Sequence, residues 1–350
     1  MRQPAVFFYL PPSLWPDDLP DNAVLNWSGF GLGIYAWTIQ TYLRVREAGL
    51  RCALVDYLPE KGIVFLHRNG FRDHQQGIEM SPQRLLVCFQ SDVLPHPDAQ
   101  VHVVQNQTQE NCQTHSYFMP HWPQPGLLSR QHDRGDRFDT VAFFGHATNL
   151  APEFLGHQWV ATLRELGLNW RPVINTNRWN EHHSLNTQWN DYRQVDAVVA
   201  VRSFDPIVLE QTKSYCYKPA TKLYNAWLAG VPAILGPESG YRMERQTALD
   251  YLEVTAFDQV LPTLLRLKED AALRQAMVGN GRMRSQTITP AYLTQRWLSF
   301  IQDTLFPLYD EWCSQSHWQQ QLRSHYSHWR YHSQRLHQRL QAKQYSANRG

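Results

Sequence analysis

The sequence predicts an α/β protein with two doubly wound units, each built on a mostly parallel sheet, followed by a helical tail. Short apolar runs alternate with longer helical patterns along most of the chain, which is typical of strands joined by crossover helices. The chain has 350 residues, of which 43% are hydrophobic and 18% are charged. This length and this composition favour two globular domains over one.

The first unit is predicted over residues 1–125. It begins with a buried strand at Ala5–Leu10, a glycine-containing loop at Asn26–Gly33 and a helix from about Ile34 to Ala48. Further strands are predicted at 51–56, 63–66, 84–89 and 100–104. Because the carboxyl ends of parallel strands share one edge of a sheet, polar residues just after these strands are candidate ligand contacts.

An interdomain linker is predicted at residues 126–138, after the proline-rich stretch Pro120–Gly126. The second unit is predicted over residues 139–300. Its strands are expected at 140–144, 196–201, 232–235 and 254–257. Its helices are expected at 152–166, 257–267, 270–278 and 292–312, and from Thr221 onward.

The predicted extension at 301–350 has an unusual composition. From Trp312 to Gly350 it contains six Lys/Arg and five His, with no Asp or Glu. Its large apolar residues recur near helical spacing, at Trp318, Leu322, Tyr326, Trp329, Leu336 and Leu340. Three interpretations stay open: a helix packed on the body or in a homo-oligomer contact, a helix docked on an anionic membrane surface, or a frayed tail.

Several classes of protein are disfavoured by composition. The net charge of +2 gives no reason to expect a nucleic-acid partner. Five scattered cysteines without a CxxC pair favour reduced thiols over a zinc site or a disulfide framework. No apolar run is long enough to span a membrane, and Met1–Leu10 is too short for a signal peptide. We therefore expect a cytoplasmic protein, peripheral at the inner membrane face if the tail docks there.

The segment Lys218–Gly240 carries the clearest chemical signal. Lys218 and Lys222 stand at the start of a predicted helix, which is followed by Gly230-Val231-Pro232, a short apolar strand and a loop rich in Gly, Pro and Ser. The start of a helix with nearby lysines suits a diphosphate, because the amide groups and the cations both attract negative charge. Read as simple surface cations, these lysines would oppose the helix dipole.

Over residues 6–300 the chain resembles the GT-B glycosyltransferases, which have two Rossmann-like domains facing a cleft. Within that stretch, Lys222–Ala226 followed by Gly230–Pro237 resembles the donor-binding motif of the α-1,3-fucosyltransferases. The resemblance implies that the first domain binds the acceptor, that the second binds a nucleotide sugar, and that Lys222 contacts the diphosphate. Thr221 stands where that family has a glutamate that holds the ribose.

The two glutamates of the retaining GT-B branch correspond here to Tyr217 and Asn225, so the stereochemistry stays open. Arg202, just past a predicted strand, is a third candidate for the diphosphate. The candidates for contacting the donor sugar or ribose are Glu238, Ser239, Gly240, Asn225 and Tyr217. An alternative for the loop at 238–240 is a cap for a helix at 241–252.

Two further features lie in the first domain, and a third concerns metal binding. Gly29, Gly31 and Gly33 precede a helix and allow close approach to a phosphate or sugar, or, in a competing interpretation, form a dinucleotide loop with Asp56. Candidates for the general base of an inverting transfer are His67, Asp92 and Glu110. No metal is expected, because no Asp-x-Asp sequence occurs and His182-His183 lack the HExxH spacing.

These observations together predict a metal-independent hexosyl- or fucosyltransferase-like enzyme. It would need no cofactor beyond its co-substrate, a nucleoside-diphosphate sugar, and its acceptor would be a carbohydrate or another hydroxyl compound. Two alternatives stay open: an NAD(P)-dependent oxidoreductase, and a non-catalytic nucleotide- or glycan-binding protein with the same fold.

Overall fold

The computed structural model describes residues 3–74, 77–175 and 187–347. The chain divides into two compact units. The first unit holds Met1–Asn22, Gly33–Met119 and Thr294–Gly350, and the second holds Ala23–Leu32 and Pro120–Leu293. Residues 126–138, predicted as a linker, fall in the second unit, and the predicted extension at 301–350 falls in the first.

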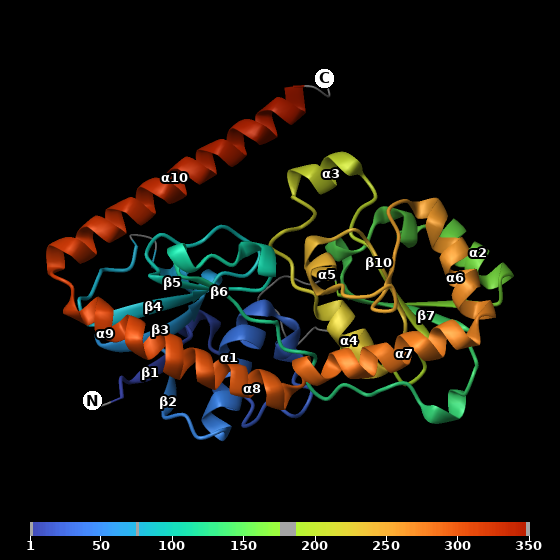
Figure 1. Cartoon of the computed structure of the whole chain (residues 1–350), viewed down its shortest axis with the longest axis horizontal. Coiled ribbons are helices and arrows are strands. Elements are labelled where there is room, and N and C mark those ends of the chain that lie inside the picture. The colour runs from blue at the N-terminus through green and yellow to red at the C-terminus, as the bar shows by residue number, and fades with distance from the viewer. Residues whose placement is uncertain (1–2, 75–76, 176–186, 348–350) are drawn as a thin grey trace. The chain divides into compact units, whose positions relative to one another are not determined.

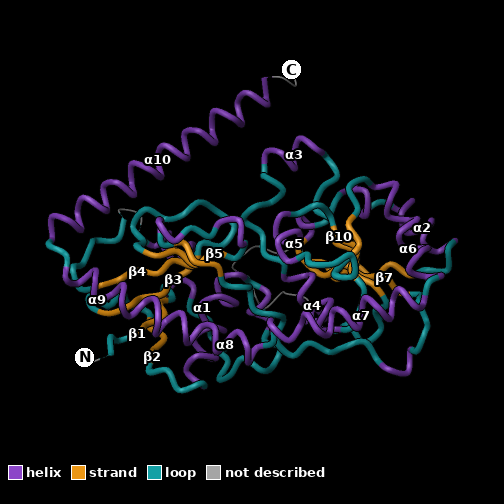
Figure 2. The backbone as a smooth tube through the Cα atoms, viewed as in Figure 1, coloured by secondary structure: helices purple, strands orange, loops and turns teal. Residues whose placement is uncertain are grey.

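The first unit contains a six-stranded sheet in the order β2-β1-β3-β4-β5-β6, in which every neighbouring pair is parallel (Figure 2). Its strands are β1 (Val6–Tyr9), β2 (Cys52–Val55), β3 (Gly62–His67), β4 (Arg84–Phe89), β5 (Val101–Val104) and β6 (Ser116–Phe118). The order reverses at β1, because β2 lies on one side of it and β3 on the other.

Aromatic rings fill the core of the first unit. Phe65 of β3 stacks on Phe8 and Phe89, with ring centroids 4.8 and 5.6 Å apart. Trp37 of α1 (Gly33–Glu47) stacks on Phe89, and Trp297 of α8 (Pro290–Ser299) contacts both Phe65 and Phe89 edge-on. Because α8 supplies this ring, the last part of the chain is built into the first unit.

The chain ends in three consecutive helical segments of the first unit. A π-helical turn at Phe300–Leu305 joins α8 to α9 (Phe306–Ser314), so the helix predicted at 292–312 is not one regular helix. The long helix α10 (His317–Ala347) follows (Figure 1). Among the described residues, no helix is both long and apolar enough to cross a membrane.

The second unit contains a five-stranded parallel sheet in the order β11-β10-β9-β7-β8. Its strands are β7 (Thr140–His146), β8 (Asn169–Asn175), β9 (Ala197–Ala200), β10 (Ala233–Leu235) and β11 (Leu252–Glu253). Its helices are α2 (His157–Glu165), α3 (Pro206–Gln211), α4 (Thr221–Ala229), α5 (Ser239–Glu244), α6 (Val260–Glu269) and α7 (Ala271–Ser285). The order reverses at β7, which lies between β8 and β9.

Two parallel sheets with helices and a C-terminal helical tail confirm the predicted fold class. The strands β6 and β8 were not predicted. β8 is an edge strand whose first residues are exposed or half-buried and include Pro172, so it has no apolar run. The helix considered at 241–252 ends at Glu244, because Asp250 accepts hydrogen bonds from the amides of Gln246 and Thr247 and holds a loop there.

A buried carboxylate ties the segment before β7 to the second sheet. Asp196, 2% exposed, accepts hydrogen bonds from the side chains of Arg130 and Arg134 and from the amides of Asp139 and Thr140. Burial opposes ionisation of Asp196, but the bonds from Arg134 and from the two amides outweigh it, so the pKa of this carboxyl lies below its usual value.

We expect Asp196→Asn to lower the free energy of unfolding at pH 7 by ~3–5 kcal/mol, because buried Arg134 would lose its buried partner charge and keep only the half-buried carboxylate of Asp139. A lowered folded-state pKa stabilises above the unfolded pKa of ~3.9, and this stabilisation is lost as the pH falls through the folded-state value. Urea unfolding should therefore show the difference from wild type shrinking in acid below about pH 4. The exposed Asp133→Asn is the matched control, with a change within ~0.5 kcal/mol; equal losses in both variants would contradict this role.

Candidate active site

The carboxyl edge of the second sheet brings three predicted cations to one place. The strand order reverses at β7, and in parallel sheets the crevice at such a reversal is the usual ligand site. Arg202 follows β9, while Lys218 and Lys222 lie just before and within the first turn of α4. All three act electrostatically on the same buried carboxyl, that of Glu238.

Lys222 lies across the carboxyl end of β7. Its Nζ is 5.6 Å from the centroid of the Phe143 ring, and its Cε lies 3.3 Å from the position that a Cβ would take on Gly145. A side chain at position 145 would therefore crowd the lysine. The N-cap residue of α4 is Ala220, which has no side-chain oxygen to cap the helix start beside Lys222.

Arg202 and Glu238 form a buried ion pair at the same edge. Nη1 of Arg202 donates to Oε2 of Glu238, and its Nε donates to Oδ1 of Asn149 over 3.1 Å. The guanidinium also lies 5.7 Å from the ring centroid of Tyr215. Arg202 thereby links residues that follow β7, β9 and β10.

Glu238 is 2% exposed and is the N-cap residue of α5. Burial raises the pKa of its carboxyl, and Arg202, Lys222 and Lys218 oppose this rise. Oε1 is buried and has no hydrogen-bond partner among the described residues. A buried acceptor of this kind is suited to a ligand hydroxyl.

The other candidates for the donor sugar have different surroundings. Ser239 and Gly240 form the first turn of α5, and Tyr217 lies half-buried before Lys218. Asn225 is buried in α4, where its Oδ1 accepts from the amide of Gln124 over 3.0 Å. The side chain of Asn225 therefore anchors the segment around Gln124, near the start of the second unit's long segment Pro120–Leu293.

The turn before α4 has an unusual backbone that the sequence did not reveal. Lys213, Ser214 and Tyr215 all have left-handed φ values, of 49, 51 and 58°. Three such non-glycine residues in a row are costly and are typical of functional loops. Asn149 and Tyr215, which contact Arg202, were also not predicted, because only the tertiary fold brings them to it.

In the first unit, the carboxyl edge of the sheet gathers Gly33, His67 and Ser91. A Cβ on Gly33 would lie 3.8 Å from Nε2 of His67 and 4.0 Å from Oγ of Ser91. Gly33 opens α1, whereas Gly29 and Gly31 lie in a 3₁₀ turn, Ser28–Gly31, that belongs to the second unit. The three glycines are thus divided between the two units.

The candidate bases differ in how they are held. His67 is buried, and its Nδ1 accepts a hydrogen bond from the amide of Asn69 over 3.1 Å. Asp92 accepts from Nε2 of Gln105 over 2.7 Å, and Gln105 in turn accepts from the indole of Trp37. Glu110 is exposed and accepts from the amide of Phe118.

Among the described residues, no three His, Cys, Asp or Glu side chains gather in a way that could hold a metal ion. His182 and His183 lie outside the described residues.

No protein-family model matches the chain, and no curated protein matches it. Solved structures do resemble it. A glycosyltransferase from Rickettsia africae ESF-5 aligns with a TM-score of 0.48 and 8% identity over 90% of this chain and 100% of that one. TarM aligns with a TM-score of 0.47 and 9% identity, over 75% of this chain and 58% of the TarM chain. HepE of Anabaena, in complex with UDP and glucose, aligns with a TM-score of 0.45 and 9% identity, over 86% of this chain and 100% of the HepE chain.

We expect the Arg202–Glu238 pair to show strong coupling in a double-mutant cycle. Arg202→Met or Glu238→Leu alone should cost ~3–5 kcal/mol of unfolding free energy, because each leaves one buried charge without its partner. The double variant should cost less than the sum of the two, by more than ~1 kcal/mol. Urea unfolding measures all four proteins, and simple additivity would show that the pair is not coupled.

Proposed function

We propose that the protein is a GT-B-type glycosyltransferase that moves a sugar from a nucleoside-diphosphate donor to an acceptor hydroxyl without a metal ion. The observation that carries this proposal is the position of Lys222, Arg202 and Lys218 around one buried carboxyl at the carboxyl edge of the second sheet. A dinucleotide loop in the first unit gains no similar support, because its glycines are divided between the two units.

The chemistry needs positive charge where the leaving group departs. Transfer breaks the bond between the anomeric carbon and the β-phosphate oxygen, and the nucleoside diphosphate leaves with one more negative charge. Cations held in place before the reaction stabilise this charge without reorganising. Lys222 lies at a helix start, where backbone amides add to the same field, so Lys222 is the first candidate for the diphosphate.

The neighbouring carboxyl is suited to a hydroxyl of the donor. Glu238 keeps one oxygen on Arg202, and Oε1 is the oxygen without a described partner. A ribose or sugar hydroxyl that donates to Oε1 would satisfy this buried acceptor. Ser239 and Gly240, the next two residues, would contact the same part of the donor.

We assign the general base to Asp92 and a hydrogen-bond-donor role to His67. Because Nδ1 of His67 accepts from the amide of Asn69, neutral His67 carries its proton on Nε2 and donates from there. A nitrogen that carries a proton cannot remove one from the acceptor hydroxyl. Asp92 is a carboxylate held in place by Gln105, so it is the better base.

We expect Lys222→Ala to weaken the binding of UDP or GDP by at least ~10-fold, the size of a lost charge-assisted hydrogen bond. Isothermal titration calorimetry on the full chain measures this. Lys61→Ala, which removes an exposed lysine of the first unit, is the control and should bind as wild type does. Unchanged affinity in Lys222→Ala would remove the basis of the donor assignment.

We expect Asp92→Asn to lower kcat of sugar transfer by ~100-fold or more while leaving nucleoside-diphosphate affinity unchanged, because only proton removal is lost. His67→Gln keeps a donor and should lose less. A product assay with a panel of UDP- and GDP-sugars measures both variants. Equal kcat in Asp92→Asn and wild type would move the base elsewhere.

The same assays separate the two alternatives. An oxidoreductase would be protected from heat by NADH rather than by UDP or GDP. A non-catalytic binding protein would bind a nucleoside diphosphate but release no transferred or hydrolysed sugar.

We propose further that α10 docks on an anionic membrane surface. Its large apolar side chains stay exposed, with Trp318 and Trp329 each 66% exposed. At 100° per residue, the exposed apolar residues fall in one sector about 80° wide; they are Trp318, Leu322, Tyr326, Trp329, Leu336 and Leu340. Residues 317–347 contain basic residues but no Asp or Glu, so an anionic surface complements the helix better than a second copy of it would.

We expect full-length protein to co-sediment with vesicles containing phosphatidylglycerol but not with pure phosphatidylcholine vesicles. Trp318→Ala/Trp329→Ala should lower the bound fraction several-fold, because interfacial tryptophans supply much of the binding. Trp15→Ala, which removes a partly exposed tryptophan outside the helix, is the control. If the double variant instead abolishes a dimer seen by light scattering without lipid, the helix is a homo-oligomer contact.

A further inference from the structure

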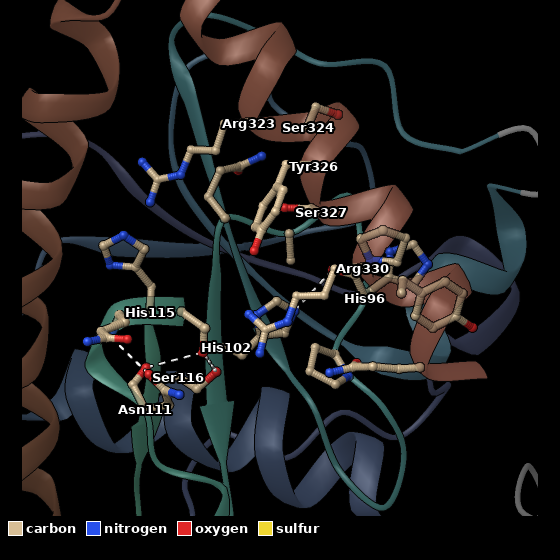
Figure 3. Close-up of a pocket in the computed structure, with 18 of the residues that line it drawn as sticks. His96, His102, Asn111, His115, Ser116, Arg323, Ser324, Tyr326, Ser327 and Arg330 are labelled. Atoms are coloured by element: carbon tan, nitrogen blue, oxygen red, sulfur yellow. Dashed lines mark hydrogen bonds between the residues drawn. The ribbon is translucent and has the colours of Figure 1, made fainter. Parts of the chain in front are cut away.

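A cavity of about 430 Å³ lies in the first unit between α10 and the segments that lead into β5 and β6 (Figure 3). Its lining includes Gln100 and His102 at the start of β5 and His115 and Ser116 at the start of β6. These are the amino ends of parallel strands. His67 is the last residue of β3, and Ser91 follows the carboxyl end of β4, so the cavity is separate from the candidate active site.

The cavity is lined by positive groups without a matching carboxylate. Arg323 and Arg330 of α10 both line it, and neither makes an ion pair with any described residue. No Asp or Glu is among the lining residues. Of the nearby carboxylates, that of Asp98 accepts from His328 over 2.7 Å and from the amide of Ile78, and that of Glu311 accepts from Nε2 of Gln315 over 3.3 Å.

The pKa values of two histidines that line the cavity reflect the same positive charge. The pKa of His102 is lowered to about 4, mainly by burial; a backbone hydrogen bond opposes the lowering, and Arg68, Arg330 and His115 add to it. Burial also lowers the pKa of His115, where Arg323 adds to the effect and Glu311 opposes it. At neutral pH these rings are therefore uncharged donors or acceptors beside the two guanidinium groups.

The arrangement of the lining side chains suits an anion. Arg323 and Arg330 are two helical turns apart, and Figure 3 shows Arg330 beside His102 and Arg323 on the side of His115. Side-chain hydroxyls and amides complete the lining, from Asn111, Ser116, Tyr326, Ser327 and Gln334. The volume is that of a small-molecule site. Two guanidinium forks with neutral donors around them suit the oxygens of a phosphate group.

We propose that this cavity binds a phosphate-class anion, a mono- or diphosphate group carried by a soluble compound or by a lipid headgroup. The two arginines hold the phosphate oxygens, and the hydroxyl and amide side chains complete the shell. This site does not depend on the sugar-transfer proposal, because it shares no residue with the candidate donor site around Lys222.

The first test measures inorganic pyrophosphate binding in a Lys222→Ala background, which removes the donor contact. Pyrophosphate should still raise the melting temperature and bind in calorimetry. Arg323→Gln/Arg330→Gln should weaken that binding by at least ~10-fold. Arg335→Gln/Arg339→Gln removes the same charge from the same helix outside the cavity and should change the affinity by less than about two-fold.

The second test separates the two sources of phosphate, using vesicles containing phosphatidylglycerol. If pyrophosphate does not bind but Arg323→Gln/Arg330→Gln lowers vesicle binding more than Arg335→Gln/Arg339→Gln does, the site takes a lipid phosphate and the proposal holds. If the two double variants behave alike with both probes, the positive charge of the helix acts only in a diffuse way and the proposal is overturned. If the protein binds pyrophosphate but no nucleoside diphosphate, the proposal for this cavity holds and the proposal for the donor site fails.

Discussion

The buried pair of Arg202 and Glu238 is the interaction on which the candidate donor site depends. Arg202 follows β9, Glu238 caps the start of α5 after β10, and Asn149, which Arg202 also holds, follows β7. One guanidinium thus fixes three loops at the edge where the strand order reverses. Taking both charges out of water is costly, and an apolar pair would often be as stable. The pair is therefore better explained by what it positions than by the stability it adds.

The same pair contributes to the charge of the candidate donor site. Burial raises the pKa of Glu238, and Arg202, Lys222 and Lys218 oppose this rise; the carboxylate in turn offsets part of their positive charge. Three cations alone would bind a nucleoside diphosphate tightly before and after the reaction, and tight binding of the product slows its release. In the proposed transfer reaction, a carboxylate among them would lower the affinity for the free diphosphate. Its second oxygen, Oε1, would still offer an acceptor to a neutral hydroxyl of the donor.

The sequence predicts what depends on local order and misses what depends on partners. The strand at 84–89 and the start of α4 at Thr221 are found from apolar runs and from helix signals, and both match the structure. β8 is missed because an edge strand carries few apolar residues. The Arg202–Glu238 contact joins residues 36 positions apart, and no local pattern records it. For His67, the residue was a candidate from its position, but its tautomer follows only from the amide of Asn69.

The tail helix shows why periodicity alone does not assign a face. A stripe of Trp, Tyr and Leu on a helix usually packs against the core. On α10 the contacts with the body are polar instead: Gln320 donates to the carbonyl of Pro82, and His328 bonds Asp98. Arg323 and Arg330 stand next to that polar side and line a cavity rather than a packed interface. Apart from Tyr326, which also lines that cavity, the apolar stripe is turned away from the body and gains little from hydrophobic burial on it. In the proposed docking, the stripe is buried on a second surface, and the charge of the helix favours an anionic one.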